Sequence, residues 1–411
     1  MRIIKFVLIF HVFFFGNASF AQQGFVVNGA TVTIENGASI YVHDFTNKQE
    51  NGIDGSVNLD GNIIIKGNIT NNSNGDLFTN IESTPDGHTI LSGNDQSIQG
   101  TNRIFFENLD IKNATKTYNL DLCEVKGVFD IDGVFLLNKN KLIIDNKNAN
   151  AITYHSGYIK SETKPNEGLG EIEWKIGNAT NTFNVPFGSG SGTNDINVSL
   201  TTKTEAGDDN GSVLFATYPT DWQNAPYPDI VSTLDGFEPK DLADRYWKIE
   251  PVFTSKPDIM ITFKFNEADV DPSDNPDMVV AKLKAIRFNN EIGKWKDFKM
   301  SGICNPADKS ITTDYIFAKD FYSYWTLGEY IIPNAFTPDG DGVNDIFLKG
   351  FSIKIINRWG EILYEGEDGW DGKTNGKAVS PGTYFFVASM PDINSTEKSI
   401  TGSITVILNK N

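Results

Sequence analysis

The chain is poor in the residues that most often carry catalysis and metal binding. Among its 411 residues there are two cysteines and four histidines. The histidines of the mature chain, His43, His88 and His155, are isolated, without HExxH or paired-histidine metal spacing. The stretch GSGSG at 188–192 places glycine, not serine, at the centre of what would be a nucleophile elbow. We therefore expect no enzymatic activity.

Two cysteines are too few for a disulfide framework. Cys123 and Cys304 lie in segments that we assign below to different domains. This separation favours two buried free thiols over a bridge, although export of the chain would permit a bridge.

Basic residues are also scarce, with 35 lysines and arginines against 53 acidic residues and a net charge of −18. A field of this sign repels phosphate backbones and anionic membranes, which argues against nucleic-acid binding. It favours solubility and could recruit divalent cations.

Long apolar runs are missing after the N-terminus, so no transmembrane segment is expected in the mature chain. The N-terminus reads MRIIKFVLIFHVFFFGNASFA, with Arg2 and Lys5 before an apolar stretch from Phe6 to Phe15. The small residues Ser19 and Ala21 follow this apolar stretch, at positions −3 and −1 from the expected cleavage site. This pattern predicts a secretory signal peptide over residues 1–21, cleaved after Ala21; the alternative is a retained anchor. Loss of its two basic residues leaves the mature chain more negative still.

Residues 22–154 repeat short β-rich runs that end in Asn, Asp or Gly, as in GSVNLDGNIIIKGNITNN. Apolar and polar residues alternate at period two, and turn residues recur every 8–12 positions, as is typical of strands. The pattern predicts a β-solenoid-like region whose corners hold Gly and Asn in left-handed conformations. An antiparallel sandwich is the alternative.

Residues 155–330 have a different texture, with aromatic residues at alternate positions in strands such as DRYWKIEPVF and KDFYSYWTLGEY. We expect a central antiparallel β-sandwich, with one short helix around 239–245. The acidic loops contain Asp208 and Asp209, and then the aspartates of DVDPSDNPD at 269–277. They are calcium candidates or solvated loops. Trp222, Tyr227 and Trp295 are candidates for sugar stacking or for core packing.

Residues 331–411 have strands of their own and open with PNAFTPDGDGVNDIF. Aligning Gly342 to position 6 of an EF-hand loop leaves Leu348 where the closing acid belongs, which excludes a full EF-hand. A looser calcium site on Asp339, Asp341 and Asp345 remains open beside the simpler interpretation, tight Asp-Gly turns.

Five blocks follow one another in this segment: NAFTPDGDGVNDIF, INRWG, WDG, SPGTYFF and GSITV. In this order they resemble the gliding motility-associated C-terminal domain of Bacteroidetes, the type B sorting domain of the type IX secretion system. The resemblance implies an immunoglobulin-like β-sandwich that the outer-membrane translocon reads after the signal peptide has delivered the chain to the periplasm. The motif positions are Asn334, Phe336, Pro338, Gly340, Asp341, Gly342, Asn344, Asp345, Asn357, Arg358, Trp359, Gly360, Trp370, Asp371, Gly372, Pro381, Gly382, Thr383 and Tyr384.

The same blocks have a physical interpretation. Pro381 and Gly382 suit positions i+1 and i+2 of a type II turn. Trp359 and Trp370 are large enough to fill the core of a small domain. Arg358 is either a structural residue or a contact for the translocon.

We therefore expect an all-β exported protein of three domains, directed to the cell surface or the medium by its C-terminal domain. The two domains before the C-terminal domain are the exported cargo. We expect this cargo to be structural or adhesive, with cell-surface proteins or glycans as partners. One alternative is a secreted protein that binds or degrades carbohydrate, and another is a component of the gliding apparatus. Calcium is the one cofactor that the sequence suggests.

Overall fold

The computed structural model describes residues 24–408 except 80–85, 191–192, 233, 235–236, 277, 292, 330–331, 341–344, 349–351, 368 and 390–398. Within these residues the chain is all-β, and its helical segments are short 3-10 turns. It divides into two compact units, Met1–Glu329 and Tyr330–Asn411. No helix in the described part is long and apolar enough to cross a bilayer. The predicted signal peptide, with Ala21, lies outside the described residues.

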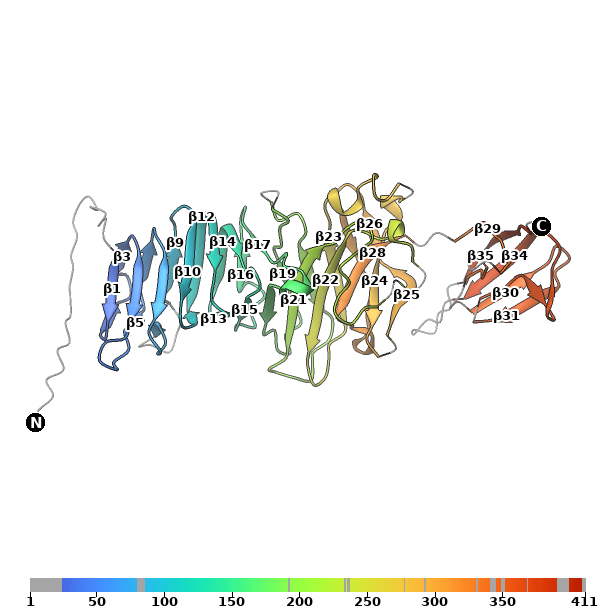
Figure 1. The fold of residues 1–411 in the computed structure, drawn as a ribbon. Helices are drawn as coiled ribbons and strands as arrows, with labels where there is room; N and C mark the ends of the chain where they lie inside the picture. The colour runs from blue at the N-terminus through green and yellow to red at the C-terminus, as the bar shows by residue number, and fades with distance from the viewer. Residues whose placement is uncertain are drawn as a thin grey trace, which may run out of the picture. The chain divides into compact units, whose positions relative to one another are not determined.

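The first unit begins as a β-solenoid whose rungs stack on one another (Figure 1). Its first three rungs each supply one strand to each of three faces. All pairings between these rungs are parallel, which confirms the predicted solenoid and excludes the antiparallel alternative here. The strands are β1 (Phe25–Asn28), β2 (Thr31–Ile34), β3 (Ser39–Val42), β4 (Phe45–Lys48), β5 (Ser56–Leu59), β6 (Asn62–Ile65), β7 (Ile69–Asn72), β8 (Phe78–Thr79) and β9 (His88–Leu91).

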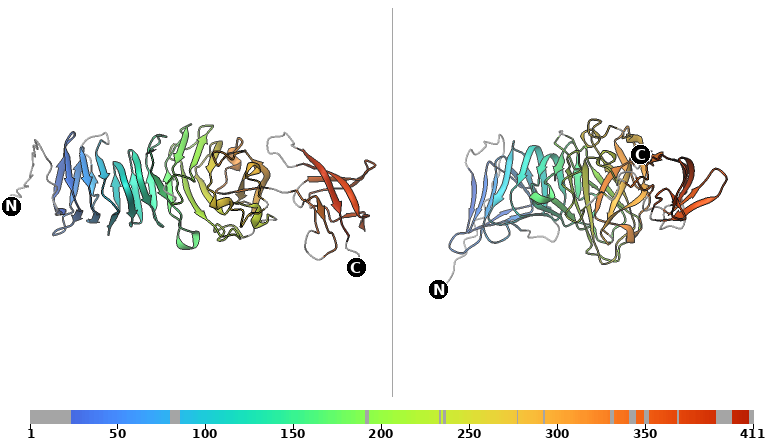
Figure 2. Two further views of the ribbon diagram at one scale, coloured as in Figure 1. Left: turned by 90° about the horizontal axis from the view of Figure 1, so that it is seen from above. Right: turned by 45° about the vertical axis from the view of Figure 1, so that its right-hand side comes forward.

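The later rungs are joined by two long strands. β12 pairs with β9 through its first half and with β10 through its second half, so that two faces merge into one eleven-stranded sheet. Both views in Figure 2 show this stack of rungs. The strands are β10 (Gln96–Gly100), β11 (Ile104–Phe106), β12 (Asn108–Tyr118), β13 (Leu122–Val125), β14 (Phe129–Leu136), β15 (Lys141–Ile144), β16 (Ile152–Tyr154) and β17 (Tyr158–Lys160).

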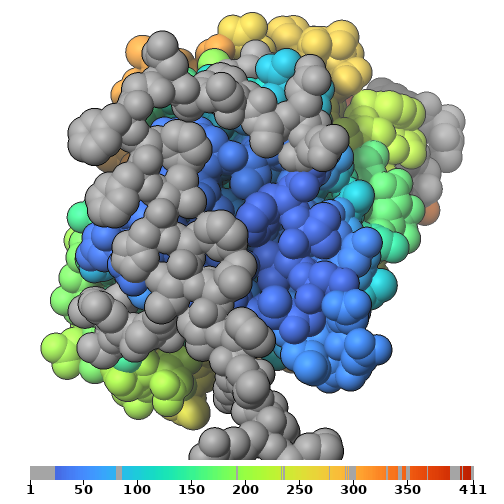
Figure 3. All heavy atoms as spheres, turned by 90° about the vertical axis from the view of Figure 1, so that its left-hand side faces the viewer, coloured from blue at the N-terminus to red at the C-terminus, as the bar shows by residue number. Residues whose placement is uncertain are grey.

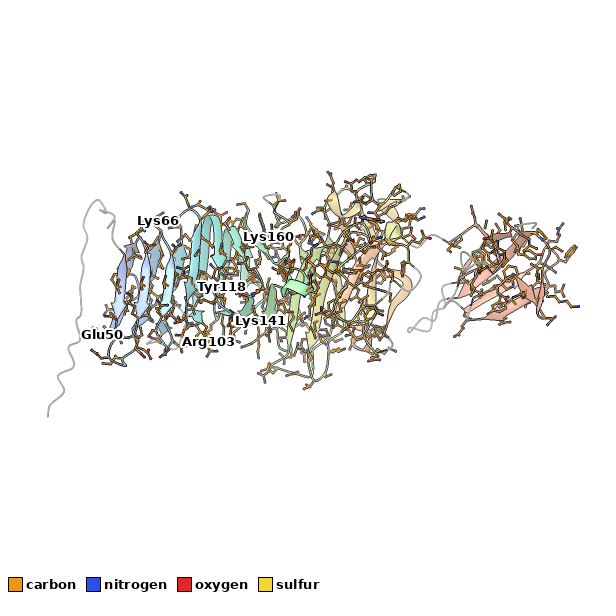
Figure 4. The ribbon with its side chains drawn as sticks, in the orientation of Figure 1. Glu50, Lys66, Arg103, Tyr118, Lys141 and Lys160 are labelled. Atoms are coloured by element: carbon orange, nitrogen blue, oxygen red, sulfur yellow. The ribbon has the colours of Figure 1, made fainter. Side chains whose placement is uncertain are left out.

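Alternating residues explain this fold, because every second side chain of a strand points inward. Phe45, Ile69 and Ile98 stack in register in the core, and Tyr118 lies among the strands (Figure 4). Asn51, Asn113 and Asn138 hold corners at φ between 51° and 56°, as predicted for corner asparagines.

Buried asparagines also link the rungs. The Asn47 side-chain amide donates to Asn71 Oδ1 at 3.0 Å, and the Asn71 amide donates to the Arg103 carbonyl at 3.0 Å. Both asparagines are fully buried, so these bonds replace water for groups that would otherwise be unsatisfied. At the first rung, shown end-on in Figure 3, the side chains of Val26 and Tyr41 are about half exposed, at 52% and 53%.

The change from parallel to antiparallel pairing occurs at β18 (Glu171–Trp174). This strand pairs in parallel with β15 and antiparallel with β21 (Ser212–Pro219). One nine-stranded sheet therefore starts in the solenoid and ends in the antiparallel part. The division predicted between residues 154 and 155 falls inside the first compact unit.

Two sheets make up the rest of the first unit. Aromatic contacts join them, with ring centroids 5.2 Å apart for Trp174–Phe183 and for Trp247–Phe263. The nine-stranded sheet continues through β22 (Arg245–Val252), β28 (Tyr324–Gly328), β24 (Lys284–Asn289) and β25 (Lys294–Ser301). The five-stranded sheet contains β19 (Thr182–Val185), β20 (Val198–Thr202), β23 (Ile259–Lys264), β27 (Ser310–Thr312) and β26 (Ile303–Asn305). The predicted short helix is a 3-10 turn, Pro239–Asp241.

A buried ion cluster connects the end of the solenoid with the antiparallel part. Arg245, 2% exposed, donates from Nη1 to Glu162 at 2.8 Å and from Nε to Asp269 at 2.9 Å. Since a charge is costly to bury without such partners, these bonds fix three distant segments in one arrangement. Cys123 and Cys304 are both buried and free, as predicted.

The second unit has a five-stranded mixed sheet in the order β29-β35-β34-β30-β31 and a small hairpin of β32 and β33. Its core is formed by alternate residues of β30 and β34 and by the aromatic residues of the connecting segments. The strands are β29 (Ala335–Phe336), β30 (Ser352–Ile356), β31 (Ile362–Gly366), β32 (Lys373–Thr374), β33 (Lys377–Ala378), β34 (Gly382–Ser389) and β35 (Ser399–Val406).

Candidate functional site

Aromatic side chains from three of the five sequence blocks meet in the core of the second unit. Phe336 lies 5.9 Å from Phe347 and 5.4 Å from Trp370, measured between ring centroids. Trp370 contacts Tyr384 at 5.3 Å, and Phe347 contacts Phe386 at 5.2 Å. All five rings are at most 9% exposed. The opening block, WDG, and SPGTYFF therefore share one cluster, and GSITV supplies β35 beside it.

Backbone bonds hold the opening block in place. Ala335 and Phe336 pair in parallel with Thr405 and Val406 of β35. Phe347 and Trp370 exchange two backbone hydrogen bonds of 2.9 Å each. The first and last blocks of the unit are thus neighbours in space, and the segment around 347 is fixed to the WDG turn.

Gly372 allows two motif segments to approach closely. Its φ is +72°, and a Cβ at this position would meet Pro338 Cγ at 2.6 Å. A glycine is required here both for its left-handed conformation and for the space that it leaves.

Tyr384 anchors the start of β34. Its hydroxyl donates to the Ser380 carbonyl at 2.7 Å, four residues back, in the manner of a tyrosine corner. The type II turn predicted at Pro381 and Gly382 is wrong, because Gly382 has φ 152° instead of about 80° and already begins the strand. The strand's pairing with β35 starts at this glycine and requires the extended chain.

The loop after Phe336 is described in part. Gly340 has φ 86° and donates its N–H to Asp345 Oδ1 at 2.6 Å, which suits a tight Asp-Gly turn. Asp341, Gly342 and Asn344 lie outside the described residues. Among the residues that are described, no group of three His, Cys, Asp or Glu could hold a metal ion. The calcium site on Asp339, Asp341 and Asp345 stays a prediction.

The INRWG block forms the turn between β30 and β31. Asn357 Oδ1 accepts from the N–H groups of Trp359 and Glu361 at 3.0 Å each, and Gly360 has φ 87°. The Asn357 amide donates to the Glu361 carboxylate at 2.9 Å. Asn357 and Gly360 therefore shape the turn itself.

The side chains of Arg358 and Trp359 take no part in the hydrogen bonds described for this turn. The Arg358 guanidinium lies over the Trp359 ring, 5.1 Å from its centroid, and Trp359 is 80% exposed. The prediction that Trp359 fills the core is wrong, because the turn presents it to solvent, whereas Trp370 is fully buried as predicted.

The comparison with known families decides what this unit is. Residues 330–406 match the CHU_C type IX secretion signal domain. This segment is a type IX secretion signal domain. The match agrees with the resemblance that the sequence blocks indicated. No curated protein and no solved structure matches the chain.

Most motif residues of the secretion signal domain have structural roles, as the contacts above show. Asp371 belongs to this group: the side chain of Lys373, 2.8 Å away, is the main cause of its lowered pKa. Asn334 accepts the Thr405 N–H through its carbonyl, at 2.9 Å. Thr383 pairs with Thr405 across β34 and β35.

Sequence reasoning missed the outer face of the sheet in the secretion signal domain. Ile356 of β30 pairs with Ile362 of β31 on one side and with Phe385 of β34 on the other. Ile362 is 53% exposed and Phe385 49%. A shallow hollow of about 430 Å³ lies beside Ile356 and Phe385. The segment TYFFV could have indicated this face. Side chains alternate between the two faces of a strand, so if Tyr384 and Phe386 point inward, Phe385 must point outward.

The acidic candidates of the first unit are spread over separate turns. Asp269 binds Arg245, and Asp209 binds Lys147 at 2.6 Å. Asp208 and Asp271 bind backbone N–H groups, which are the main causes of their lowered pKa values. Asp277 lies outside the described residues.

Of the three aromatic candidates, Trp295 is buried at 3% exposure and stacks on Tyr246 with centroids 5.8 Å apart. Tyr227 is half-buried, and Trp222 is 62% exposed.

Proposed function

We propose that this protein is exported through the type IX secretion system and serves as a structural or adhesive protein at the cell surface or outside the cell. The observation that carries this proposal is the match of residues 330–406 to the type IX secretion signal domain. A signal domain addresses the chain to the secretion system, so the first unit is the cargo. The partner of the second unit is the outer-membrane translocon.

Several features of the cargo support a structural role. Its parallel rungs form one continuous hydrogen-bonded repeat, and buried asparagines tie rung to rung. Repeats of this kind present extended surfaces, which suit adhesion. We further propose that the two antiparallel sheets form a β-sandwich and that the second unit is immunoglobulin-like. The ring contacts between the two sheets support the first point.

A cargo without enzymatic activity is part of the proposal. The three histidines of the mature chain lie on separate strands or turns of the solenoid. His88 binds Asp110 at 2.6 Å, whereas His43 and His155 are more than half exposed. This placement, with each histidine on its own strand or turn, supports a cargo without enzymatic activity.

The test compares the full chain with a chain that ends at Glu329, in a strain with a working type IX system and in one without it. We expect the full chain outside the cell only in the first strain. The shortened chain should stay in the periplasm in both.

Glycan binding by the cargo is the second candidate, because Trp222 is the one tryptophan of the first unit with a largely exposed ring. Exposed aromatic rings can stack on sugar faces. If this candidate is correct, a polysaccharide in a native gel retards the full chain, and Trp222→Ala removes most of the retardation. Trp359→Ala is the matched control and should migrate like the unchanged chain. Equal retardation of all three proteins would contradict a role for Trp222.

A further inference from the structure

The fold accounts for most of the motif residues of the secretion signal domain, but not for Arg358 and Trp359. Phe336, Trp370 and Tyr384 fill the core, and Gly372 makes room for Pro338. By contrast, the Trp359 ring is 80% exposed, and its ring contact is with Arg358 next to it. Of the seven tryptophans in the chain, five are at most 3% exposed. A tryptophan left in water therefore needs a reason other than folding.

An apolar row on the outer face of the sheet begins at the two ends of the turn that carries Trp359. Ile362, Ile356 and Phe385 are directly opposite one another on β31, β30 and β34. Residues opposite each other on neighbouring strands have Cβ atoms about 5 Å apart, so their side chains form a continuous stripe. The turn that carries Trp359 joins two of these strands. We call Trp359, Ile362, Ile356 and Phe385 the outer apolar stripe.

The hollow beside the stripe has room for a side chain of a binding partner. Its volume is about 430 Å³, and its walls come from Ile356, Val387 and Phe385 and from the neighbouring segment 401–403 of β35. Small residues, Gly402 and Ser403, form one wall. The stripe is therefore a ridge of large side chains beside a hollow.

One cation, Arg358, lies beside Trp359 and has no carboxylate partner among the described residues. Arg358 is the only arginine of the second unit, and among the described residues no carboxylate forms an ion pair with it. Lys354 and Lys373, by contrast, are paired with Glu365 and Asp371 at 3.0 and 2.8 Å. An arginine stacked on an aromatic ring keeps its donors free for a carboxylate of a partner.

We propose that the outer apolar stripe, with Arg358 at its border, is the surface by which the type IX translocon binds this domain. The proposal rests on the proposed function. It commits to a protein partner that offers an apolar wall and a carboxylate facing Arg358. Tryptophan and arginine are the side chains on which binding energy most often concentrates in protein interfaces. The match to a secretion signal domain supplies the reason for a partner at this unit.

The experiment measures export of the full chain carrying Trp359→Ala or Phe385→Ala in a strain with a working type IX system. Each variant should lower the amount outside the cell at least tenfold and accumulate in the periplasm. Trp222→Ala is the matched control, a 62% exposed tryptophan of the first unit, and should be exported normally. Thermal unfolding of the purified chain should be unchanged in Trp359→Ala, because this ring is 80% exposed, and lowered only slightly in Phe385→Ala, because half of that ring is exposed.

The outcomes separate the two proposals. Normal export of both variants, with the unchanged chain dependent on the system, overturns the stripe and leaves the proposed function intact. Export of the unchanged chain in a strain without the system overturns the proposed function itself.

A second measurement covers the case in which a variant loses stability. A photo-reactive residue placed at 359 in the full chain should cross-link to the translocon protein, and one at 222 should not. Equal cross-linking at the two positions, or none at 359 in a chain that is exported, overturns the stripe.

Discussion

At the scale of single residues, the motif of the secretion signal domain separates into positions that fold the domain and positions that remain exposed. Asn357, Gly360 and Gly372 each satisfy a geometric demand of a turn or of a close approach. Arg358 and Trp359 satisfy none that the described contacts reveal. This separation cannot be made from the sequence, where all five residues look alike as motif positions.

Gly372 gives the sharpest test at this scale. Gly372→Ala adds a Cβ at φ +72° and 2.6 Å from Pro338, so it combines backbone strain with overpacking. We expect a loss of about 2–4 kcal/mol in the unfolding free energy of the second unit. The measurement is calorimetric unfolding of the full chain, following the transition that a chain ending at Glu329 lacks.

Gly376→Ala is the control for this change. Gly376 has nearly the same φ, +74°, and a Cβ there would have no atom within 4 Å. Its substitution should cost about 1 kcal/mol, the strain alone. If the two variants are equally stable, the contact with Pro338 has no energetic role.

At the scale of elements, the period of the sequence predicted the solenoid well. Alternation at period two and turn residues at short intervals lead to stacked rungs once left-handed corners at Asn51, Asn113 and Asn138 are allowed. The size of Trp359 alone predicts burial, yet burial depends on where a turn directs the side chain. The ion cluster of Arg245 could not be predicted either, since Glu162 and Asp269 reach it from distant segments.

Asp244, which directly precedes β22, makes the stability of the antiparallel part depend on pH. The residue is 6% exposed and accepts from the Asn224 amide at 3.1 Å. Burial, and then the negative charge of Asp274, raises the pKa of Asp244 from its ordinary 3.8 to about 7. The folded chain therefore holds this proton over a range in which the unfolded chain has released it. The stability that protonated Asp244 contributes is fully present below about pH 4 and is lost as the pH rises to about 7.

Asp244→Asn should remove that loss. Compared with the unchanged chain, the variant should be more stable above pH 7 by on the order of 4 kcal/mol, because the pKa of Asp244 rises from 3.8 to about 7 and each pKa unit corresponds to about 1.4 kcal/mol. The measurement is denaturant unfolding of the full chain from pH 5 to pH 8. Asp271→Asn is the control, since Asp271 is exposed and its pKa is lowered. Parallel pH profiles for Asp244→Asn and the unchanged chain would refute this assignment.

At the scale of the whole molecule, the chain consists of a cargo unit and a secretion signal unit, each with its own core. The sequence revealed the second unit through five ordered blocks, because the demands of one small core leave a recognisable pattern. It could not reveal the role of the first unit, since a surface that binds a partner needs no fixed spacing of chemical groups in the sequence. The sheet that runs from the solenoid into the antiparallel part could not be predicted either, because pairing between strands that are distant in the sequence produces no local sequence pattern.

The most direct measurement of the central claim is the fraction of the protein that externally added protease can reach on cells and in the medium. It compares the full chain with the chain that ends at Glu329, both in a strain with a working type IX system. The account predicts that the full chain is accessible and that the shortened chain is protected in the periplasm. An accessible shortened chain would contradict it, and residues 330–411 would then have to be studied as a binding domain.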